Sequence, residues 1–302
     1  SKRAVAMAEA AATDDVTDLI LNFARFFGSG TGSGEAFGMS GGATPRAYRN
    51  VSSTTWTFQS TFTLTTAAGG GGVADFDGRI YFLQNSRGSS WDGTTYTAAA
   101  FTFTNNNSTP RPAKVYAGFL YMGNGRTLTR WDGTTLTDLF SLPTGFTIRS
   151  LEVYGDVLVF TADNGQFSRI FLYRNGSSTF ESFYDIPVES LGPKLFQSQG
   201  ILWLFGSSQA GINIYTFNGS SLEKVFLLPS GALPLTSAGY VAEYMGQVVF
   251  GVTDNTSADF EDGMGGVWMI GRAGPNYPWT ISLMFPTDGV ADSIIGGIYS
   301  SG

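Results

Sequence analysis

The sequence predicts a single all-β domain assembled from repeated four-stranded units, and three observations lead to this prediction. The chain has 302 residues, which include 40 Gly, 25 Phe and 13 Tyr, whereas only 14% are charged. This composition suits aromatic-rich strands joined by tight turns, and it does not suit a helical bundle. Two short sequence patterns also recur along the chain and alternate with each other, which indicates a repeated structural unit.

The first pattern is an aromatic residue, then Asp or Asn, then usually Gly and a pair of Ser or Thr residues. Its copies read WDGTTY, WDGTTL, YRNGSSTF, FNGSSL and, in degenerate form, YRNVSSTTW. Their Asp or Asn residues are Asn50, Asp92, Asp132, Asn175 and Asn218, at intervals of 42, 40, 43 and 43 residues. Asp-Gly and Asn-Gly between apolar runs favour hairpin turns, because their positive-φ conformations match the strand twist. We expect one hairpin at each copy.

The second pattern is a Gly that precedes an apolar strand, and its copies lie between those of the first. They are Gly78, Gly118, Gly155, Gly200, Gly246 and Gly297. A period of about 40 to 45 residues with four strands is typical of the blades of a β-propeller. One four-stranded sheet cannot bury both of its faces, so the units must stack. A β-solenoid or an irregular sandwich is the alternative, although solenoid repeats are normally shorter.

The two ends of the chain predict about six blades, with seven as the alternative. Gly289 to Gly302 is similar to Gly72 to Ser86, so the chain ends partway into another blade. We expect strands from both ends to close the ring. Residues 1–28 are interpreted as a short helical or extended arm with the first strand, and residues 29–302 as the propeller. Within it, Gly28 to Gly42 is expected to be a flexible loop, because it is rich in Gly and Ser.

The composition argues against most catalytic chemistry. The chain has no Cys and no His, which removes thiolate chemistry and the commonest general base and metal ligand. A glycosidase needs two positioned carboxylates, but the acidic residues lie mostly in repeated turns. We therefore expect no catalytic residue and no cofactor. The net charge of −7 and the lack of a basic stripe argue against specific nucleic-acid binding, and no apolar window is long enough to span a membrane.

Two groups of residues are the candidates for sites. The first is the acidic loop Thr253 to Gly266, a weak candidate for Ca²⁺ because carboxylate oxygens ligate that ion; its acidic residues are Asp254, Asp259, Glu261 and Asp262. The second is the repeated turn, which we interpret as structural; its residues are Trp91, Asp92, Trp131, Asp132, Asn175 and Asn218. The aromatic residues before these turns either line repeated sugar pockets or pack between blades, and packing is the favoured interpretation.

The WDGTT turn that follows a Gly-led apolar strand resembles the propellers of tailed-phage virion proteins, such as tail, nozzle and adhesin components. The resemblance covers roughly residues 45–302 and rests on a short motif, so no functional residue is carried over. It implies a non-enzymatic structural protein that is made in a host cytoplasm and joins other virion proteins in a multi-subunit assembly. Residues 3–12 are Ala-rich and favour a helix, and they are either a docking arm or a frayed tail. A glycan-binding, lectin-like or adhesin-like propeller is the alternative, and a propeller glycosidase is the second alternative.

Overall fold

The computed structural model describes residues 6–7, 20–40, 43–52, 55–67, 71–105, 109–186, 191–208, 211–229, 241–252, 266–272, 274, 277–286 and 298–299. All regular secondary structure in these residues is β-strand, and they contain no helix. The strands form six four-stranded antiparallel sheets, each a meander of four consecutive strands. The prediction of an all-β propeller with six four-stranded blades is therefore confirmed. The expected Ca²⁺ loop and residues 3–5 and 8–12 of the arm lie outside the described residues.

The blades follow one another along the chain, and each is numbered here by its order. The first three blades are blade 1 with β2 (Ile20–Arg25), β3 (Ala36–Ser40), β4 (Ala47–Ser52) and β5 (Thr55–Phe58); blade 2 with β6 (Gly72–Phe76), β7 (Arg79–Leu83), β8 (Arg87–Trp91) and β9 (Tyr96–Thr102); and blade 3 with β10 (Ala113–Tyr116), β11 (Phe119–Asn124), β12 (Thr127–Trp131) and β13 (Leu136–Ser141).

The other three are blade 4 with β14 (Thr147–Tyr154), β15 (Val157–Asp163), β16 (Ser168–Tyr173) and β17 (Ser182–Ile186); blade 5 with β18 (Leu191–Ser198), β19 (Ile201–Ser208), β20 (Gly211–Phe217) and β21 (Leu222–Pro229); and blade 6 with β22 (Val241–Tyr244), β23 (Gln247–Val252), β24 (Gly266–Gly271) and β25 (Thr280–Pro286).

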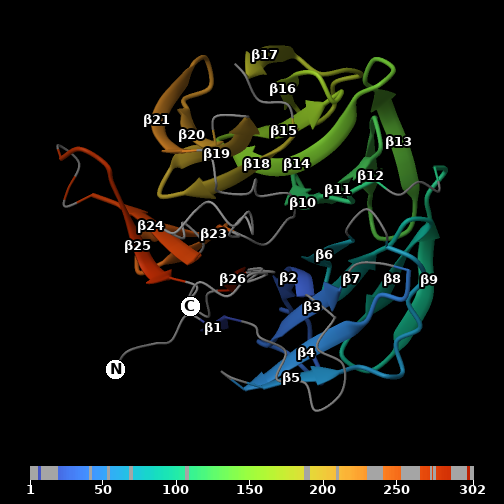
Figure 1. Cartoon of the computed structure of the whole chain (residues 1–302). Helices are drawn as coiled ribbons and strands as arrows, with labels where there is room; N and C mark the ends of the chain where they lie inside the picture. Colours follow the sequence, from blue (N-terminus) through green and yellow to red (C-terminus); the bar gives the residue numbers. More distant parts are fainter. Residues whose placement is uncertain are drawn as a thin grey trace.

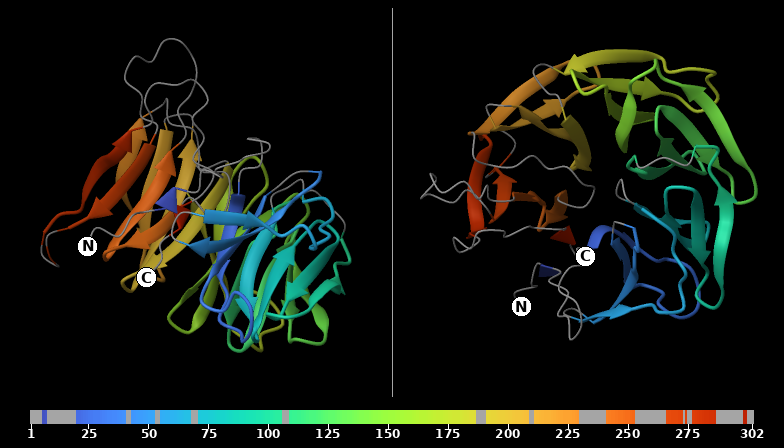
Figure 2. Two further views of the ribbon diagram at one scale, coloured as in Figure 1. Left: turned by 90° about the horizontal axis from the view of Figure 1, so that it is seen from below. Right: turned by 45° about the vertical axis from the view of Figure 1, so that its right-hand side comes forward.

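The blades are arranged around a central axis, with the first strand of each blade innermost (Figures 1 and 2). The last blade faces the first at the point where strands from near the two ends of the chain lie (Figure 2). There, β1 (Ala6–Met7) pairs with β26 (Ile298–Tyr299) as a separate two-stranded sheet. Each of the six blades is thus one continuous segment of chain, and the two ends of the chain meet in a sheet of their own.

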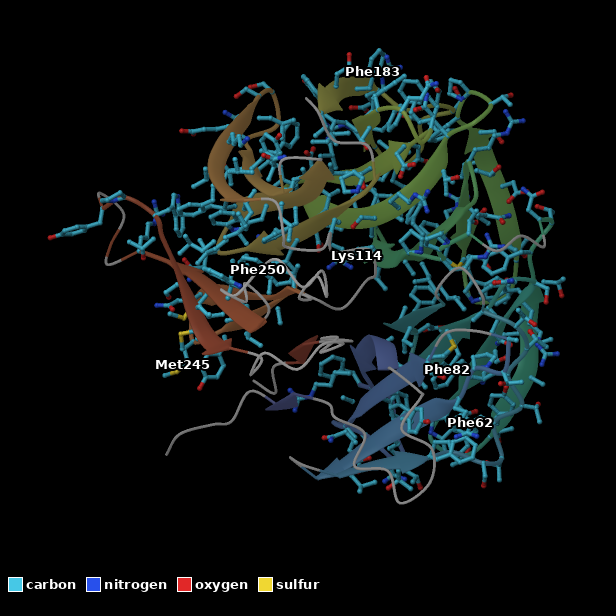
Figure 3. All side chains as sticks on the ribbon, viewed as in Figure 1. Phe62, Phe82, Lys114, Phe183, Met245 and Phe250 are labelled. Carbon is cyan, nitrogen blue, oxygen red and sulfur yellow. The ribbon has the colours of Figure 1, made fainter. Side chains whose placement is uncertain are left out.

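The hydrophobic core consists of clusters between adjacent blades. Trp131 of blade 3 packs on Phe101 of blade 2 with ring centroids 4.7 Å apart, and Tyr173 of blade 4 packs on Phe140 of blade 3 at 5.5 Å. Phe62 and Phe82, labelled in Figure 3, belong to the cluster that joins blades 1 and 2. Burying one such aromatic side chain stabilises the fold by about 2 to 3 kcal/mol, so the clusters hold neighbouring blades together.

Each blade has two ends, and they differ in their turns. Connections between the first and second strands, and between the third and fourth, lie at one end of the ring, here called the turn face. Four of the connections between a first and a second strand are two-residue turns. Both of their residues have positive φ, as a type I′ turn requires: Asp77–Gly78, Ala117–Gly118, Gln199–Gly200 and Met245–Gly246. The Gly-led pattern of the sequence marks these turns.

Candidate functional site

The repeated Asp and Asn residues close their turns with their own side chains. Asp92 Oδ1 accepts hydrogen bonds from the backbone N–H groups of Thr94 at 2.9 Å and Thr95 at 2.7 Å. Asp132 and Asn218 make the same pair of bonds, at 2.7 and 2.6 Å and at 3.0 and 2.9 Å. In each of these three turns, only the Gly that follows the Asp or Asn has a positive φ, between 95° and 99°. The expected hairpin forms at each of these three turns, and the Asp or Asn side chain closes it.

Asn175 departs from this arrangement. Its side-chain oxygen accepts a hydrogen bond from the hydroxyl of Tyr121 on blade 3 at 2.7 Å, so it links two blades. The aromatic residues before the turns also contact the neighbouring blade. Trp131 is buried, and its Nε1 donates to the hydroxyl of Tyr81 at 3.2 Å. Phe217 is buried beside Tyr184 of blade 4, and Trp91 packs partly buried in the cluster of blades 1 and 2.

The junction between blades 3 and 4 is closed at the turn face by a tyrosine. The hydroxyl of Tyr116, the last residue of β10, donates to the backbone oxygen of Asp156 at 2.6 Å. It also accepts from the backbone N–H of Asn175 at 3.3 Å. The two turns of blade 4 are thus fastened to the inner strand of blade 3.

The junction between blades 1 and 2 is closed by the connection between β2 and β3. The backbone N–H of Thr31 donates to the backbone oxygen of Gly93 at 2.9 Å. A Cβ on Gly93 would lie 2.0 Å from the backbone oxygen of Ser29, and one on Gly28 would lie 2.3 Å from the oxygen of Gly78. Residues 28–34, here called the sealing loop, therefore lie on both turns of blade 2. Within the segment 28–42, which was expected to be a flexible loop, residues Ala36–Ser40 instead form the strand β3. The sealing loop is a loop, and its flexibility stays a prediction.

The junction between blades 4 and 5 has no such cover among the described residues. It holds an open recess of about 600 Å³. The glycines of its two blade 5 turns, Gly200 and Gly219, correspond to Gly78 and Gly93 of blade 2. A Cβ on Gly200 would meet nothing within 4 Å, and one on Gly219 would meet only the ring of Tyr154 at 3.9 Å. Besides the apolar Val157 and Leu172, four polar side chains line the recess: Asp156, Arg174, Glu181 and Gln197.

The charged groups of the recess form one network. Arg174 makes an ion pair with Asp156, and its Nε lies 3.1 Å from Glu181 Oε1. The hydrogen bond to Asp156 raises the pKa of Arg174, so the guanidinium stays charged. Tyr154 occupies in blade 4 the place of Tyr116 in blade 3, but the part of the chain that the structure describes offers its hydroxyl no hydrogen-bond partner. The recess therefore combines one free hydroxyl, one aromatic ring and several planar polar groups.

None of these recess residues is among the candidates that the sequence suggested. Arg174 stands where Asp92 and Asp132 stand in the other turns, directly after the aromatic residue. The connection from β16 to β17 runs from Arg174 to Glu181, eight residues, whereas the connection from Asp92 to Thr95 has four. The extra length brings Glu181 beside Arg174, and a comparison of turn lengths between the repeats would have singled this turn out.

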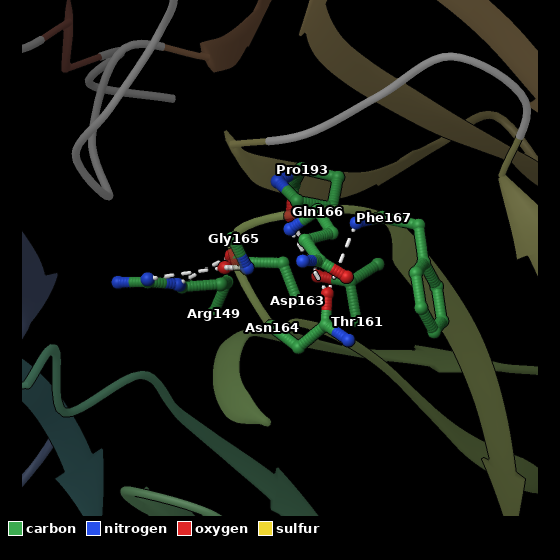
Figure 4. A network of polar contacts seen from close by, with 8 residues as sticks. All are labelled: Arg149, Thr161, Asp163, Asn164, Gly165, Gln166, Phe167 and Pro193. Atoms are coloured by element: carbon green, nitrogen blue, oxygen red, sulfur yellow. Dashed lines mark hydrogen bonds and ion pairs between the residues drawn. The ribbon is translucent and has the colours of Figure 1, made fainter. Parts of the chain in front are cut away.

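At the other end of the ring, here called the loop face, polar networks tie the blades together. Arg111 is buried and donates to Asn124 Oδ1 at 2.6 Å and to the backbone oxygens of Gln84, Asn85 and Asn105. Burial lowers its pKa to about 10. Figure 4 shows a second network, in which Thr161 donates to the backbone oxygen of Pro193 at 2.6 Å. Beside it, Arg149 makes a bidentate ion pair with the buried Asp163, at 2.6 and 3.2 Å.

Two features are absent from the described residues. The described residues contain no group of three or more acidic side chains placed to hold a metal ion. In the same residues, no helix has the length and apolar character needed to cross a membrane.

Comparisons with known proteins identify the fold. No protein-family model matches the sequence, and no curated protein matches it. A candidate 6-phosphogluconolactonase from Bacteroides uniformis superposes with a TM-score of 0.55 at 13% identity, over 84% of this chain and 83% of that chain. The calcium-binding protein regucalcin from Agrobacterium tumefaciens gives 0.51 at 12% identity, over 90% and 92%. The SapL1 lectin with bound α-methyl fucoside gives 0.48 at 13% identity, over 83% and 92%. At these identities the likeness concerns the fold alone, and the chain is a β-propeller.

Proposed function

We propose that this propeller is a non-enzymatic binding protein whose ligand, a neutral sugar of a glycan, occupies the recess between blades 4 and 5. The observation that carries the proposal is the composition of the recess, where the Tyr154 ring borders the same open space as Arg174, Glu181 and Gln197. The C–H face of a sugar ring packs on an aromatic ring, and its hydroxyl groups exchange hydrogen bonds with planar polar side chains. Binding sites of this kind combine apolar contact with a few placed polar groups.

The charge of the recess supports a neutral ligand. Two carboxylates, Asp156 and Glu181, flank the single guanidinium of Arg174, so the three groups together carry one negative charge. An acidic sugar would meet this excess negative charge, whereas a neutral sugar would not. The carboxylates accept hydrogen bonds from sugar hydroxyls, and Arg174 holds both side chains in place.

The same ion pairs support a role without catalysis. A glycosidase needs a carboxylic acid that its surroundings keep protonated, usually by burial among apolar groups. Asp156 and Glu181 both face Arg174, and their side chains are 79% and 36% exposed. Neither carboxyl group is buried among apolar side chains, so the recess lacks the surroundings that a glycosidase gives to its acid.

A glycan array followed by calorimetric titration of the best neutral glycan tests the proposal. We expect Tyr154→Ala and Glu181→Gln each to weaken binding about tenfold or more, since each removes one contact from a small ligand. Glu223→Gln is the matched control, because Glu223 is exposed on β21, outside the recess. If no glycan binds, or if the three variants bind equally well, the proposal is wrong.

A role in assembly is a second candidate, which rests on the outer rim of the ring. The outermost strands carry exposed apolar side chains, including Phe183 of β17, labelled in Figure 3, and Leu227 of β21. Exposed apolar side chains on edge strands favour contacts with other proteins. A structural place in a phage virion, formed in a host cytoplasm, is one form of this candidate, and it rests on the sequence resemblance.

Light scattering on the full chain tests the assembly candidate separately from sugar binding. A defined oligomer that Leu227→Lys or Phe183→Lys dissolves would support assembly through the rim. A monomer at every concentration tested would argue against self-assembly, and it would leave the glycan experiment unaffected.

A further inference from the structure

The turn that supplies two of the recess side chains is held by a neighbouring blade. This turn, residues 174–181, begins at Arg174 and ends at Glu181, and both residues line the recess. In blades 2, 3 and 5, the Asp or Asn side chain of the corresponding turn closes that turn. In blade 4, the side-chain oxygen of Asn175 instead accepts from the hydroxyl of Tyr121 in blade 3. Blade 3 therefore supplies a contact that the other turns supply for themselves.

A second hydroxyl of blade 3 joins the two backbone segments that bear the ion pair of the recess. The hydroxyl of Tyr116 donates to the backbone oxygen of Asp156 at 2.6 Å and accepts from the backbone N–H of Asn175 at 3.3 Å. Asn175 directly follows Arg174, which forms the ion pair with Asp156. The described residues that line the recess do not include Tyr116. This hydroxyl thus sets the spacing of the ion pair from outside the recess.

Aromatic packing fixes the two tyrosines and the far half of the turn. Tyr121 is fully buried, and its ring centroid lies 5.6 Å from that of Tyr116. Phe180, directly before Glu181, packs on Phe140 of blade 3 with ring centroids 6.2 Å apart. Side chains that are themselves fixed by packing hold their partners most precisely. Blade 3 therefore contacts the turn near both of its ends.

We propose, on the basis of the proposed sugar site, that Tyr116 and Tyr121 are positioning residues for that site. Their hydroxyl groups hold the turn and its ion pair in the arrangement that the sugar meets, and neither hydroxyl contacts the sugar. A side chain that is already ordered loses less conformational entropy when a ligand binds, so this order raises affinity without a new contact. Without either hydroxyl, Arg174 and Glu181 move more freely, and the sugar has to order them when it binds.

Calorimetric titration of the full chain with the neutral glycan that binds best tests the positioning role. We expect Tyr116→Phe and Tyr121→Phe each to weaken binding about three- to tenfold, because each variant keeps the ring and loses only the hydroxyl. Tyr96→Phe is the matched control. The Tyr96 hydroxyl donates to the backbone oxygen of Thr63 at 2.8 Å, outside the recess, so its loss should leave glycan binding unchanged.

Hydrogen exchange of the peptide that contains residues 174–181 gives a readout that a general loss of stability would not reproduce. Without glycan, we expect exchange about threefold or more faster in Tyr116→Phe and Tyr121→Phe than in the unmodified chain, and unchanged in Tyr96→Phe. Added glycan should slow this exchange more in the first two variants than in the unmodified chain, because the sugar then has to order the turn.

The outcomes separate the positioning role from the sugar site itself. If the unmodified chain binds no glycan, the sugar site is wrong and the positioning role fails with it. If the unmodified chain binds a glycan and both Tyr116→Phe and Tyr121→Phe bind it equally tightly, only the positioning role is wrong. Equal losses of affinity in these two variants and in Tyr96→Phe would also overturn that role, because the loss would then follow stability and not the order of the turn.

Discussion

The junctions between blades 1 and 2 and between blades 4 and 5 are built from the same parts, yet one is sealed and the other is open. Both present two turn glycines of the following blade, Gly78 and Gly93 in one case and Gly200 and Gly219 in the other. In the first, the sealing loop lies on these glycines; in the second, the described residues leave them uncovered. The difference lies in the connection from β2 to β3, which has ten residues where the corresponding connection in blade 4 has two. One lengthened connection is enough to seal a repeated junction.

The largest effect is expected from opening a closed junction at its buried cation. Arg111→Met removes the donor from three backbone oxygens and from Asn124, and it leaves the acceptors on Gln84, Asn85 and Asn124 buried between blades 2 and 3. Buried polar groups that lose their partner are costly, so we expect a loss of about 3 to 5 kcal/mol of unfolding free energy. Urea unfolding followed by tryptophan fluorescence measures it. A loss below about 1 kcal/mol would mean that the network contributes little.

The next effect separates the sealed junction from the open one. Gly93 and Gly219 have the same φ of 95°, so Ala at either position costs about 1 to 2 kcal/mol of backbone strain. Only at Gly93 would the added Cβ collide with a backbone atom, the oxygen of Ser29. We therefore expect Gly93→Ala to destabilise the protein by at least about 2 kcal/mol more than Gly219→Ala. Equal losses in urea unfolding would show that the sealing loop does not rest on Gly93.

A smaller effect distinguishes the two tyrosines. Tyr116→Phe removes two hydrogen bonds that fasten blade 4 to blade 3 and should cost about 1 kcal/mol. Tyr154→Phe removes a hydroxyl that has no described partner, and the free energy of unfolding should hardly change. Paired unfolding curves measure both variants. A loss at Tyr154 as large as that at Tyr116 would mean that its hydroxyl is used within the fold.

The smallest effect is a pH dependence of the repeated turn, which is expected for blade 2 and not for blade 5. Backbone N–H groups of Thr95 and Thr94 hold the pKa of Asp92 at about 2, below its unfolded value of about 3.9. Because the pKa of Asp92 is lower in the folded protein than in the unfolded chain, the charged carboxylate stabilises the fold at pH values above about 4. This stabilisation is lost as pH falls from about 4 towards 2. Asn218, at the corresponding place in blade 5, does not titrate. We expect Asp92→Asn to reduce the acid sensitivity of the melting temperature; unchanged sensitivity would contradict the assignment.

The repeat explains how much of the fold the sequence could predict. The length of a blade follows from the interval between Asp92, Asp132, Asn175 and Asn218, because a turn that recurs every 40 to 43 residues marks one unit. The recess was not predictable in this way, because it depends on departures from the repeat. The recess is lined by the longer turn that ends at Glu181 and by Tyr154. The environment of Tyr154 depends on how blade 5 packs against blade 4. Such contacts lie between units, where a repeat pattern carries no information.

Cysteine labelling tests the central claim most directly. The claim is that the junction of blades 4 and 5 is an open ligand site, whereas the junction of blades 1 and 2 is sealed. The chain has no Cys, so one introduced thiol reports on one place. Gln197 on β18 and Asp75 on β6 occupy corresponding positions. Gln197 is exposed in the recess, whereas the Asp75 carboxylate accepts a hydrogen bond from the backbone N–H of Phe27. We predict fast maleimide labelling of Gln197→Cys, slow labelling of Asp75→Cys, and protection of the former alone by the glycan that binds best. Equal rates at the two positions, or no protection at Gln197→Cys, would contradict the account.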